Sequence, residues 1–105
     1  MTDGETTLRE AQEQVDETIC RLGGYWPQMA NLARLFEECG ELARAVNQTY
    51  GPKRIKDAEA ATELADELGD VLFTVLVLAN SMDVDATAAL NGSIAKVRDR
   101  TGHAE

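Results

Sequence analysis

The sequence has little of the residue types that build many common functional sites. Its only histidine, His103, lies close to the end of the chain, and its two cysteines, Cys20 and Cys39, form no Cys-x-x-Cys pair. Zinc sites and di-iron bundles with Glu-x-x-His pairs are therefore not expected. We interpret the cysteines as small buried hydrophobic residues in a reducing compartment.

Long hydrophobic runs are also missing. An apolar segment at residues 71–79 is interrupted by Thr74 and is much shorter than the roughly 18 residues that a membrane span needs. The first seven residues are polar and acidic, unlike a secretory signal. We therefore expect a soluble, cytoplasmic protein that does not bind a membrane.

Basic residues are outnumbered by acidic ones. The chain has 19 acidic and 10 basic residues, and its formal net charge is −9. This excess disfavours nonspecific binding to nucleic acids and to anionic membranes, so no nucleic acid partner is expected. A ligand that carries phosphate would have to arrive with a metal ion or meet local basic groups.

The length and the apolar composition indicate one helical domain. The 105 residues fit a single domain, 1–105, in which residues 1–6 and 101–105 are expected to fray. Aromatic residues make up only 5% of the chain, and a core of Leu, Val and Ala suits packed helices. A chain this short buries a limited core, so oligomerisation is expected to complete the all-α bundle.

Apolar periodicity predicts four helices in the protomer. Local signals mark their ends, such as the capping box of Thr7 and Glu10 and the Asp85 N-cap. The expected bounds are about 8–21, 27–49, 59–82 and 86–100. The basic connection at residues 51–57 is the longest loop and the one expected to move.

Each of the last three helices carries an apolar stripe that is expected to face the core. In the second helix the stripe consists of Leu32, Leu35, Cys39, Leu42 and Val46. In the third it consists of Leu64, Leu68, Leu72, Val75, Ala79 and Met82, and in the fourth of Leu90, Ile94 and Val97. The C-terminal half of the third helix is apolar around nearly its whole circumference. We expect a second protomer to cover it, in a homodimer or homotetramer.

Two acidic motifs about thirty residues apart are the most informative feature. Glu37, Glu38 and Glu41 lie in the second helix, and Glu67 and Asp70 in the third. Carboxylates held together beside a core repel one another unless a cation lies between them. Packing of the two helices is expected to bring Glu38, Glu41, Glu67 and Asp70 together along one edge. Ligands that are all oxygen favour Mg²⁺, with Mn²⁺ as the other candidate.

A plainer interpretation of these acids stays open at this point. One acidic pair at this spacing is usually a solvated helix face, and the protein could be a non-catalytic acidic helical interaction module. Gly40 and Gly69, inside the two motifs, each cost roughly 0.8–1 kcal/mol of helix propensity relative to alanine. Glycine at these positions could permit close helix packing or leave room for a ligand.

The two motifs together resemble the signature of MazG-like nucleotide pyrophosphohydrolases. The order is Glu-Glu-x-x-Glu at 37–41, a spacer, and Glu-x-x-Asp at 67–70. The surrounding sequence is similar to that of small single-domain members in two segments, ARLFEECGELARAVN and ELADELGDVLFTVLVLANSMD. The resemblance extends over about residues 25–100. Phosphoribosyl-ATP pyrophosphatases and all-α dimeric dUTPases share the general plan, so the substrate stays open.

This resemblance implies an activity and a role for each acid. Family members split nucleoside triphosphates into a monophosphate and pyrophosphate with Mg²⁺, which suggests cleaning of the nucleotide pool. Glu38, Glu41, Glu67 and Asp70 would then hold one or more Mg²⁺ ions. The general base would be Glu37 or Glu41, and the sequence does not decide between them.

Four further residues are candidates for substrate binding. Lys96 and Arg100, one turn apart in the fourth helix, match a basic pair that family members place near the phosphates. Lys53 belongs to the basic loop, which either closes over the triphosphate or is a solvated linker. Trp26 either stacks on a base or anchors the core or an interface.

Overall fold

The computed structural model describes residues 5–52 and 58–102, with only the backbone of 58–62. It contains helices α1 (Leu8–Arg21), α2 (Gln28–Tyr50), α3 (Ala58–Ser81) and α4 (Ala86–Arg100). No strand occurs in these residues, so the predicted all-α class is confirmed. Helices α1 and α4 have the predicted bounds, and α2 and α3 differ from theirs by one residue. Lys53 and His103 lie outside the described residues.

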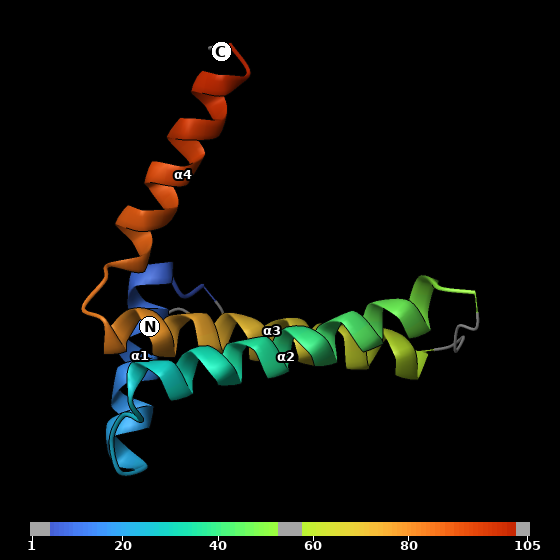
Figure 1. Ribbon diagram of the computed structural model, residues 1–105, viewed down its shortest axis with the longest axis horizontal. Helices are drawn as coiled ribbons and strands as arrows, with labels where there is room; N and C mark the ends of the chain where they lie inside the picture. The colour runs from blue at the N-terminus through green and yellow to red at the C-terminus, as the bar shows by residue number, and fades with distance from the viewer. Residues whose placement is uncertain (1–4, 53–57, 103–105) are drawn as a thin grey trace.

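The helices are arranged around one long antiparallel pair. Helices α2 and α3 lie side by side along most of their length, and α1 crosses them at the end where α2 begins and α3 finishes (Figure 1). Helix α4 leads away from the pair at the same end (Figure 1). The acidic motifs therefore lie on the two helices that pack together most extensively.

Local sequence signals account for the helix ends. The Thr7 side chain accepts from the backbone N–H of Glu10, and the Glu10 carboxylate accepts from the Thr7 N–H, which forms the predicted capping box. Asp85 caps α4 by accepting from the N–H groups of Thr87 and Ala88. Helix α1 ends before Gly23, whose φ of +115° is in the left-handed region that glycine adopts readily.

The hydrophobic core lies between α1 and the C-terminal half of α3. Val15, Leu76 and Val77 form its buried centre. A polar clamp holds its edge: the Gln12 amide donates to Asn80 Oδ1 and to the carbonyl of Val84, at 2.9 and 2.8 Å. These contacts fix the corner where α1, α3 and the start of α4 meet.

The contact between α2 and α3 is rotated relative to the predicted stripes. The least exposed side of α2 contains Asn31, Leu35, Glu38, Leu42, Ala45 and Thr49, which alternate by four and three residues. Cys39 and Val46, predicted to face the core, are exposed, and so are Leu68 and Leu72 of α3. Two acidic positions, Glu38 and Glu67, therefore lie in the seam rather than beside it.

Helix α4 is uncovered, and the prediction that its stripe faces the core of the chain is wrong. Leu90, Ile94 and Val97 are all exposed, and α4 has no buried residue. Its polar contacts with α1 are at its N-terminus, where Arg9 pairs with Asp85 at 2.8 Å and the Ala86 N–H donates to Gln12 Oε1. The apolar stripe of α4 thus has no partner within the described part of the chain.

The dimensions of the chain reflect these uncovered faces. Its radius of gyration is 16.4 Å, whereas about 13 Å is expected for a compact domain of this length. It exposes 7679 Å² of surface, whereas a folded monomer of its mass exposes roughly 5,800 Å². This excess is larger than the roughly 800 Å² that each partner contributes to a standard protein interface.

Two further expectations need correction. Cys20 and Cys39 are exposed rather than buried, because both point away from the seam and the core. A Cβ atom added at Gly40 or Gly69 would meet nothing within 4 Å among the described residues, so these glycines are not required for α2 to approach α3. Room for a ligand is the interpretation that remains for them.

No single helix in the described residues is long and apolar enough to cross a membrane. Only α3 from Glu63 together with α4, bent by 109° between them, reaches the required length and composition.

Candidate metal centre and adjoining pocket

Three carboxylates from the two acidic motifs meet at the α2–α3 seam. Glu38, Glu67 and Asp70 each offer one oxygen, and these oxygens lie within 4.8 Å of one another. Oxygens on opposite sides of one Mg²⁺ are about 4 Å apart, because each metal–oxygen distance is about 2.0–2.1 Å. A small inward movement of the side chains would therefore bring them to ligand distance. The donor set suits Mg²⁺ or Mn²⁺.

Among the described residues, Arg34 is the cation that pairs with this cluster. It lies one helical turn before Glu38, and its Nε donates to Glu38 Oε2 at 2.8 Å. This hydrogen bond, followed by the charges of Glu38, Glu37 and Asp70, raises the pKa of Arg34. The Glu38 side chain is only 14% exposed, so the ion pair is partly shielded from water. Arg34 thus offsets part of the negative charge of the cluster.

The pKa of Glu67 shows that negative charges are crowded at this site. Partial burial raises its pKa above the ordinary value of 4.5, and the charges of Asp70, Glu41, Glu38 and Glu63 raise it further. A carboxylate that is harder to ionise among other carboxylates is what a cation site is expected to show when no cation is bound. The electrostatics therefore agree with the geometry.

This shift gives a pH dependence with a definite sign. Because the pKa of Glu67 is higher in the folded than in the unfolded chain, its protonation stabilises the fold. That stabilisation is complete below the ordinary glutamate pKa and is lost as the pH rises through the folded value. In metal-free protein, replacing Glu67 with Gln should therefore flatten the fall in unfolding free energy between acid and neutral pH. Urea unfolding at a series of pH values measures how the unfolding free energy depends on pH.

The control for this series is Glu17→Gln, which removes an exposed carboxylate from α1. It should keep the wild-type pH dependence. Equal pH dependence of the Glu67 variant and the wild type would contradict the crowded cluster.

The other two acids of the α2 motif lie beside the cluster. Glu41 Oε1 accepts from Arg44 at 2.8 and 3.3 Å, and Arg44 also reaches Glu63 at 3.4 Å. Glu37 forms no hydrogen bond with the described residues, and it lines an open depression together with Glu38, Gly40 and Glu41. Glu41 is thus already paired with a cation, whereas Glu37 has no hydrogen-bond partner among the described residues.

The predicted phosphate-binding bases are not at the cluster within one chain. Lys96 and Arg100 are exposed on α4, which leads away from α2 and α3 (Figure 1). Lys53 lies outside the described residues. Among the described residues, the cations that pair with acids of the two motifs are Arg34, with Glu38, and Arg44, with Glu41.

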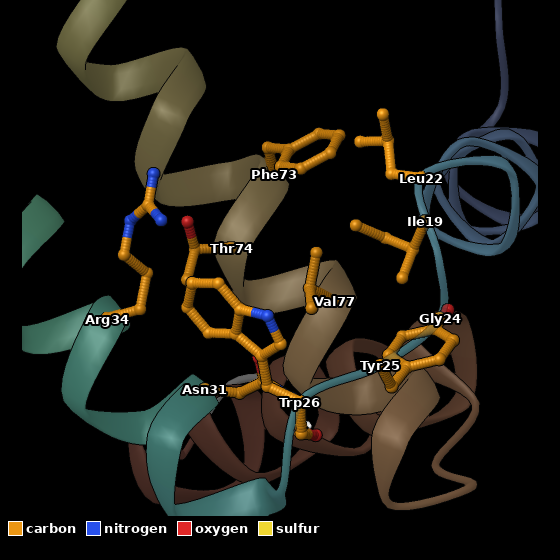
Figure 2. Close-up of a pocket in the computed structure, with 10 residues that line it drawn as sticks. All are labelled: Ile19, Leu22, Gly24, Tyr25, Trp26, Asn31, Arg34, Phe73, Thr74 and Val77. Carbon is orange, nitrogen blue, oxygen red and sulfur yellow. Dashed lines mark hydrogen bonds between the residues drawn. The ribbon is translucent and has the colours of Figure 1, made fainter.

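A pocket of about 310 Å³ adjoins the cluster along the seam. Its apolar walls come from α1, from the loop before α2 and from α3, and include Ile19, Tyr25, Trp26, Phe73 and Val77 (Figure 2). Trp26 is 56% exposed and presents its indole to the pocket (Figure 2). Burial, together with the hydrogen bond to Asp16, raises the pKa of Tyr25 to about 12, so its ring stays neutral. The pocket can therefore take a flat, largely apolar group.

Arg34 and Thr74 join this pocket to the acidic cluster. Both line the pocket, and their polar ends lie close together (Figure 2). Arg34 bonds to Glu38, and the Thr74 hydroxyl donates to the carbonyl of Asp70 at 2.8 Å. A ligand that fills the pocket and extends past Arg34 would reach the three carboxylates.

Sequence reasoning did not find Arg34, Asn31 or Thr74. The i, i+4 spacing of Arg34 and Glu38 was a readable signal, because such pairs face each other on a helix. Asn31 and Thr74 gave no signal without the register of α2 against α3.

Comparison with known proteins identifies a family over most of the chain. Residues 27–104 match the model of the MazG nucleotide pyrophosphohydrolase domain. The Bacillus subtilis protein YpjD is 41% identical over 98 residues, which are 92% of this chain and 81% of YpjD.

Solved structures agree with this match. The Bacillus-conserved MazG protein, described as a nucleotide pyrophosphohydrolase, superposes with a TM-score of 0.77 at 38% identity over 90% of this chain and 92% of its own. The YpjD structure gives a TM-score of 0.80 at 41% identity, with 91% and 97% of the two chains covered. The iMazG protein from Vibrio DAT 722 shares the fold, with a TM-score of 0.65 at 24% identity over 93% and 100% of the chains.

Proposed function

The chain belongs to the MazG nucleotide pyrophosphohydrolase family, and on this premise we propose that it converts nucleoside or deoxynucleoside triphosphates and water into a monophosphate and pyrophosphate, with Mg²⁺. The observation that carries the proposal is the meeting of Glu38, Glu67 and Asp70 within 4.8 Å, next to a pocket that can hold a base. Removal of unwanted nucleotides from the cellular pool is the role that we propose for this reaction.

The three clustered carboxylates would hold the metal ion. A bound Mg²⁺ neutralises charge on phosphate oxygens and lowers the pKa of a water molecule that it binds. Glu41 would join the ligands only if its pair with Arg44 opens. Glu37, which has no partner among the described residues, is the acid best placed to take a proton from the attacking water, so we favour it over Glu41 as the general base.

The pocket would hold the nucleoside part of the substrate. Trp26 offers an indole face on which a base can stack, and Val77 and Tyr25 exclude water from the same space. Because Arg34 lines both the pocket and the open depression, a triphosphate that extends from the pocket passes its guanidinium before it reaches the carboxylates.

Arg34 is expected to change partners when substrate binds. In the free protein it pairs with Glu38 and so competes with Mg²⁺ for that carboxylate. Replacing Arg34 with Gln should therefore tighten the binding of Mg²⁺ alone. The same change should lower kcat/KM by roughly 10- to 100-fold, because a charged hydrogen bond to the nucleotide is lost. Calorimetry with MgCl₂ and a pyrophosphate-release assay measure the two effects.

The matched control is Arg9→Gln, which breaks another arginine–carboxylate pair of 2.8 Å, far from the cluster. Arg9→Gln should change neither the binding of Mg²⁺ nor kcat/KM. Arg34→Gln with weaker Mg²⁺ binding, or with an unchanged kcat/KM, would contradict the exchange of partners.

We also propose that the enzyme works as a homodimer or homotetramer. The uncovered stripe of α4, the exposed Leu68 and Leu72 of α3, and the excess surface area support this assembly. Lys96 and Arg100 would then bind phosphate only from a second copy of the chain. Lys53 remains a predicted contact outside the described residues.

The proposed activity is tested directly by measuring pyrophosphate release from a panel of normal and modified nucleoside triphosphates, with and without MgCl₂. Release that requires Mg²⁺ is expected for at least one nucleotide. Phosphoribosyl-ATP belongs in the same panel, because its turnover in preference to triphosphates would replace the proposed substrate class.

A further inference from the structure

The loop between α1 and α2 carries two of the aromatic rings that line the pocket. Tyr25 and Trp26 are neighbours in this loop, and both line the pocket (Figure 2). The two residues before them, Gly23 and Gly24, have φ values of +115° and +103°. Glycine restricts the backbone less than any other residue does. The glycines alone therefore do not hold the two rings in place.

Hydrogen bonds tie this loop to the helices on either side of it. The Gly24 N–H donates to the carbonyl of Ile19 at 2.9 Å, and Asn31 Nδ2 donates to the carbonyl of Trp26 at 3.1 Å. Between these two ties, the Tyr25 hydroxyl donates to Asp16 Oδ1 at 2.6 Å. Such a short O–H to carboxylate distance is typical of the stronger, charge-assisted hydrogen bonds. The side chain of Tyr25 thus fastens the loop to α1.

Tyr25 connects Asp16 to the pocket through one rigid side chain. Its ring packs against the buried centre of the core, while its hydroxyl reaches Asp16. Burial, together with this hydrogen bond, raises the pKa of Tyr25 to about 12, so the hydroxyl keeps the proton that it donates. Trp26 follows directly and is 56% exposed, so packing alone does not fix its indole. The backbone position set by Tyr25 therefore bears on where the indole lies.

We infer that Asp16 is a positioning residue for nucleotide binding, because its bond to the Tyr25 hydroxyl keeps Tyr25 and Trp26 in the arrangement that forms the pocket. Asp16 does not itself line the pocket, so it acts through Tyr25 rather than on the ligand. Asp16 and Tyr25 both precede residue 27, where the match to the family domain begins. This role rests on the proposed function, in which the pocket holds the nucleoside part of the substrate.

The expected consequence is an effect on binding rather than on the chemical step. A loop that has lost its tie to α1 must be ordered when a nucleotide enters, and that ordering lowers the affinity. The three clustered carboxylates lie on α2 and α3, and Asp16 lies on α1. Loss of the tie should therefore raise KM and leave kcat nearly unchanged.

The kinetic test uses Asp16→Ala and Tyr25→Phe, the second of which keeps the ring and removes only the hydroxyl. Pyrophosphate release is measured with MgCl₂ and the triphosphate that the wild type hydrolyses fastest. Each variant should raise KM by roughly 3- to 10-fold, because Asp16 is exposed and its bond is weaker than a buried one. Each should keep kcat within about twofold of the wild type. The double variant should match the single ones, because all three lack the same bond.

A second measurement needs no nucleotide. Trp26 is the only tryptophan in the sequence, so the fluorescence of the free protein reports on this loop alone. In time-resolved anisotropy, Asp16→Ala and Tyr25→Phe should both increase the fast component that comes from local motion of the indole. Urea unfolding shows that each variant is folded under the assay conditions, so a general loss of stability would not produce this change.

Glu17→Ala is the matched control, because it removes the neighbouring exposed carboxylate of α1. It should keep the wild-type KM and anisotropy decay. The control also separates positioning from net charge. Removing a negative charge favours the binding of an anionic triphosphate, so charge alone would lower KM in Asp16→Ala rather than raise it.

The outcomes separate this role from the proposed function. An unchanged or lower KM in Asp16→Ala, or an unchanged anisotropy decay, would overturn the role of Asp16 while leaving the pyrophosphohydrolase activity in place. Increases in KM that add in the double variant would overturn it as well, because the two residues would then act separately. No release from any nucleotide by the wild type would overturn the proposed function, and the role of Asp16 with it.

Discussion

Glu38→Gln and Asp70→Asn are each expected to abolish Mg²⁺-dependent pyrophosphate release, a fall of at least about 10²–10³-fold. The amide that replaces each carboxylate still offers an oxygen but carries no charge. A metal ion contributes several kcal/mol to catalysis, so weakening its hold costs orders of magnitude in rate. The measurement is initial rate at saturating nucleotide over a range of MgCl₂ concentrations.

The same variants should keep or improve the stability of the metal-free fold. The carboxylates that raise the pKa of Glu67 include those of Glu38 and Asp70, so removing either charge relieves repulsion. Glu38→Gln also gives up the ion pair with Arg34, but a pair with a half-exposed arginine contributes little, at most about 1 kcal/mol. Urea unfolding in the absence of metal distinguishes loss of the site from loss of the fold.

Asp66→Asn is the matched control for both measurements. Asp66 is exposed and precedes Glu67 on α3, and this substitution removes the same charge without touching the three clustered oxygens. It should retain nearly full activity. Full activity in either Glu38→Gln or Asp70→Asn would remove the metal site from the proposed mechanism.

The second large effect is expected from Ile94→Glu, which should convert the assembled protein to monomers. Ile94 lies in the middle of the apolar stripe of α4, between Leu90 and Val97, and all three are exposed in the single chain. If this stripe packs against a second copy, a buried carboxylate there costs several kcal/mol, enough to weaken association by at least about 10³-fold. Sedimentation at micromolar concentration measures the change.

Activity should fall with assembly if the bases of α4 act across the interface. Lys96 and Arg100 lie beyond Ile94 on the same helix and do not reach the acidic cluster of their own chain. Ala95→Glu is the matched control, because it adds the same charge about 100° round α4 from Ile94, outside the apolar stripe. It should stay assembled and active. A wild-type protein that sediments as a monomer at micromolar concentration would contradict the assembly.

The helix ends were predictable because their causes are local. The Thr7–Glu10 box, the Asp85 cap and the glycines after α1 each act within a few residues, and the structure has them as expected. The acidic residues were recognisable for a related reason. Their spacing on each helix is a local property, and the two motifs occur in the order typical of one family.

The faces of the helices were harder to predict. Helix α3 is apolar on more than one side, and periodicity alone does not say which side packs within the chain. Leu68, Leu72, Val75 and Met82 of the predicted stripe are exposed and only Ala79 of it is buried, whereas Glu67 and Thr74 lie toward α2 instead. The prediction for helix α4 was wrong for a similar reason, because an apolar stripe has the same sequence pattern whether its own chain or a partner covers it.

The pocket depended on this register and so could not be predicted. Asn31 reads as an ordinary polar residue near the start of α2, and Thr74 as an interruption of an apolar run. That Asn31 and Thr74 line a pocket is seen only when α2 and α3 are packed antiparallel, with both side chains buried beside Trp26. Trp26 was a candidate from sequence, and the groups around it were not.

The most direct test of the account is calorimetric titration of MgCl₂ into the metal-free protein without nucleotide. If Glu38, Glu67 and Asp70 form a cation site, the wild type binds Mg²⁺ saturably and Asp70→Asn does not, while Asp66→Asn binds as the wild type does. Indistinguishable Mg²⁺ binding by the wild type and Asp70→Asn would contradict the account.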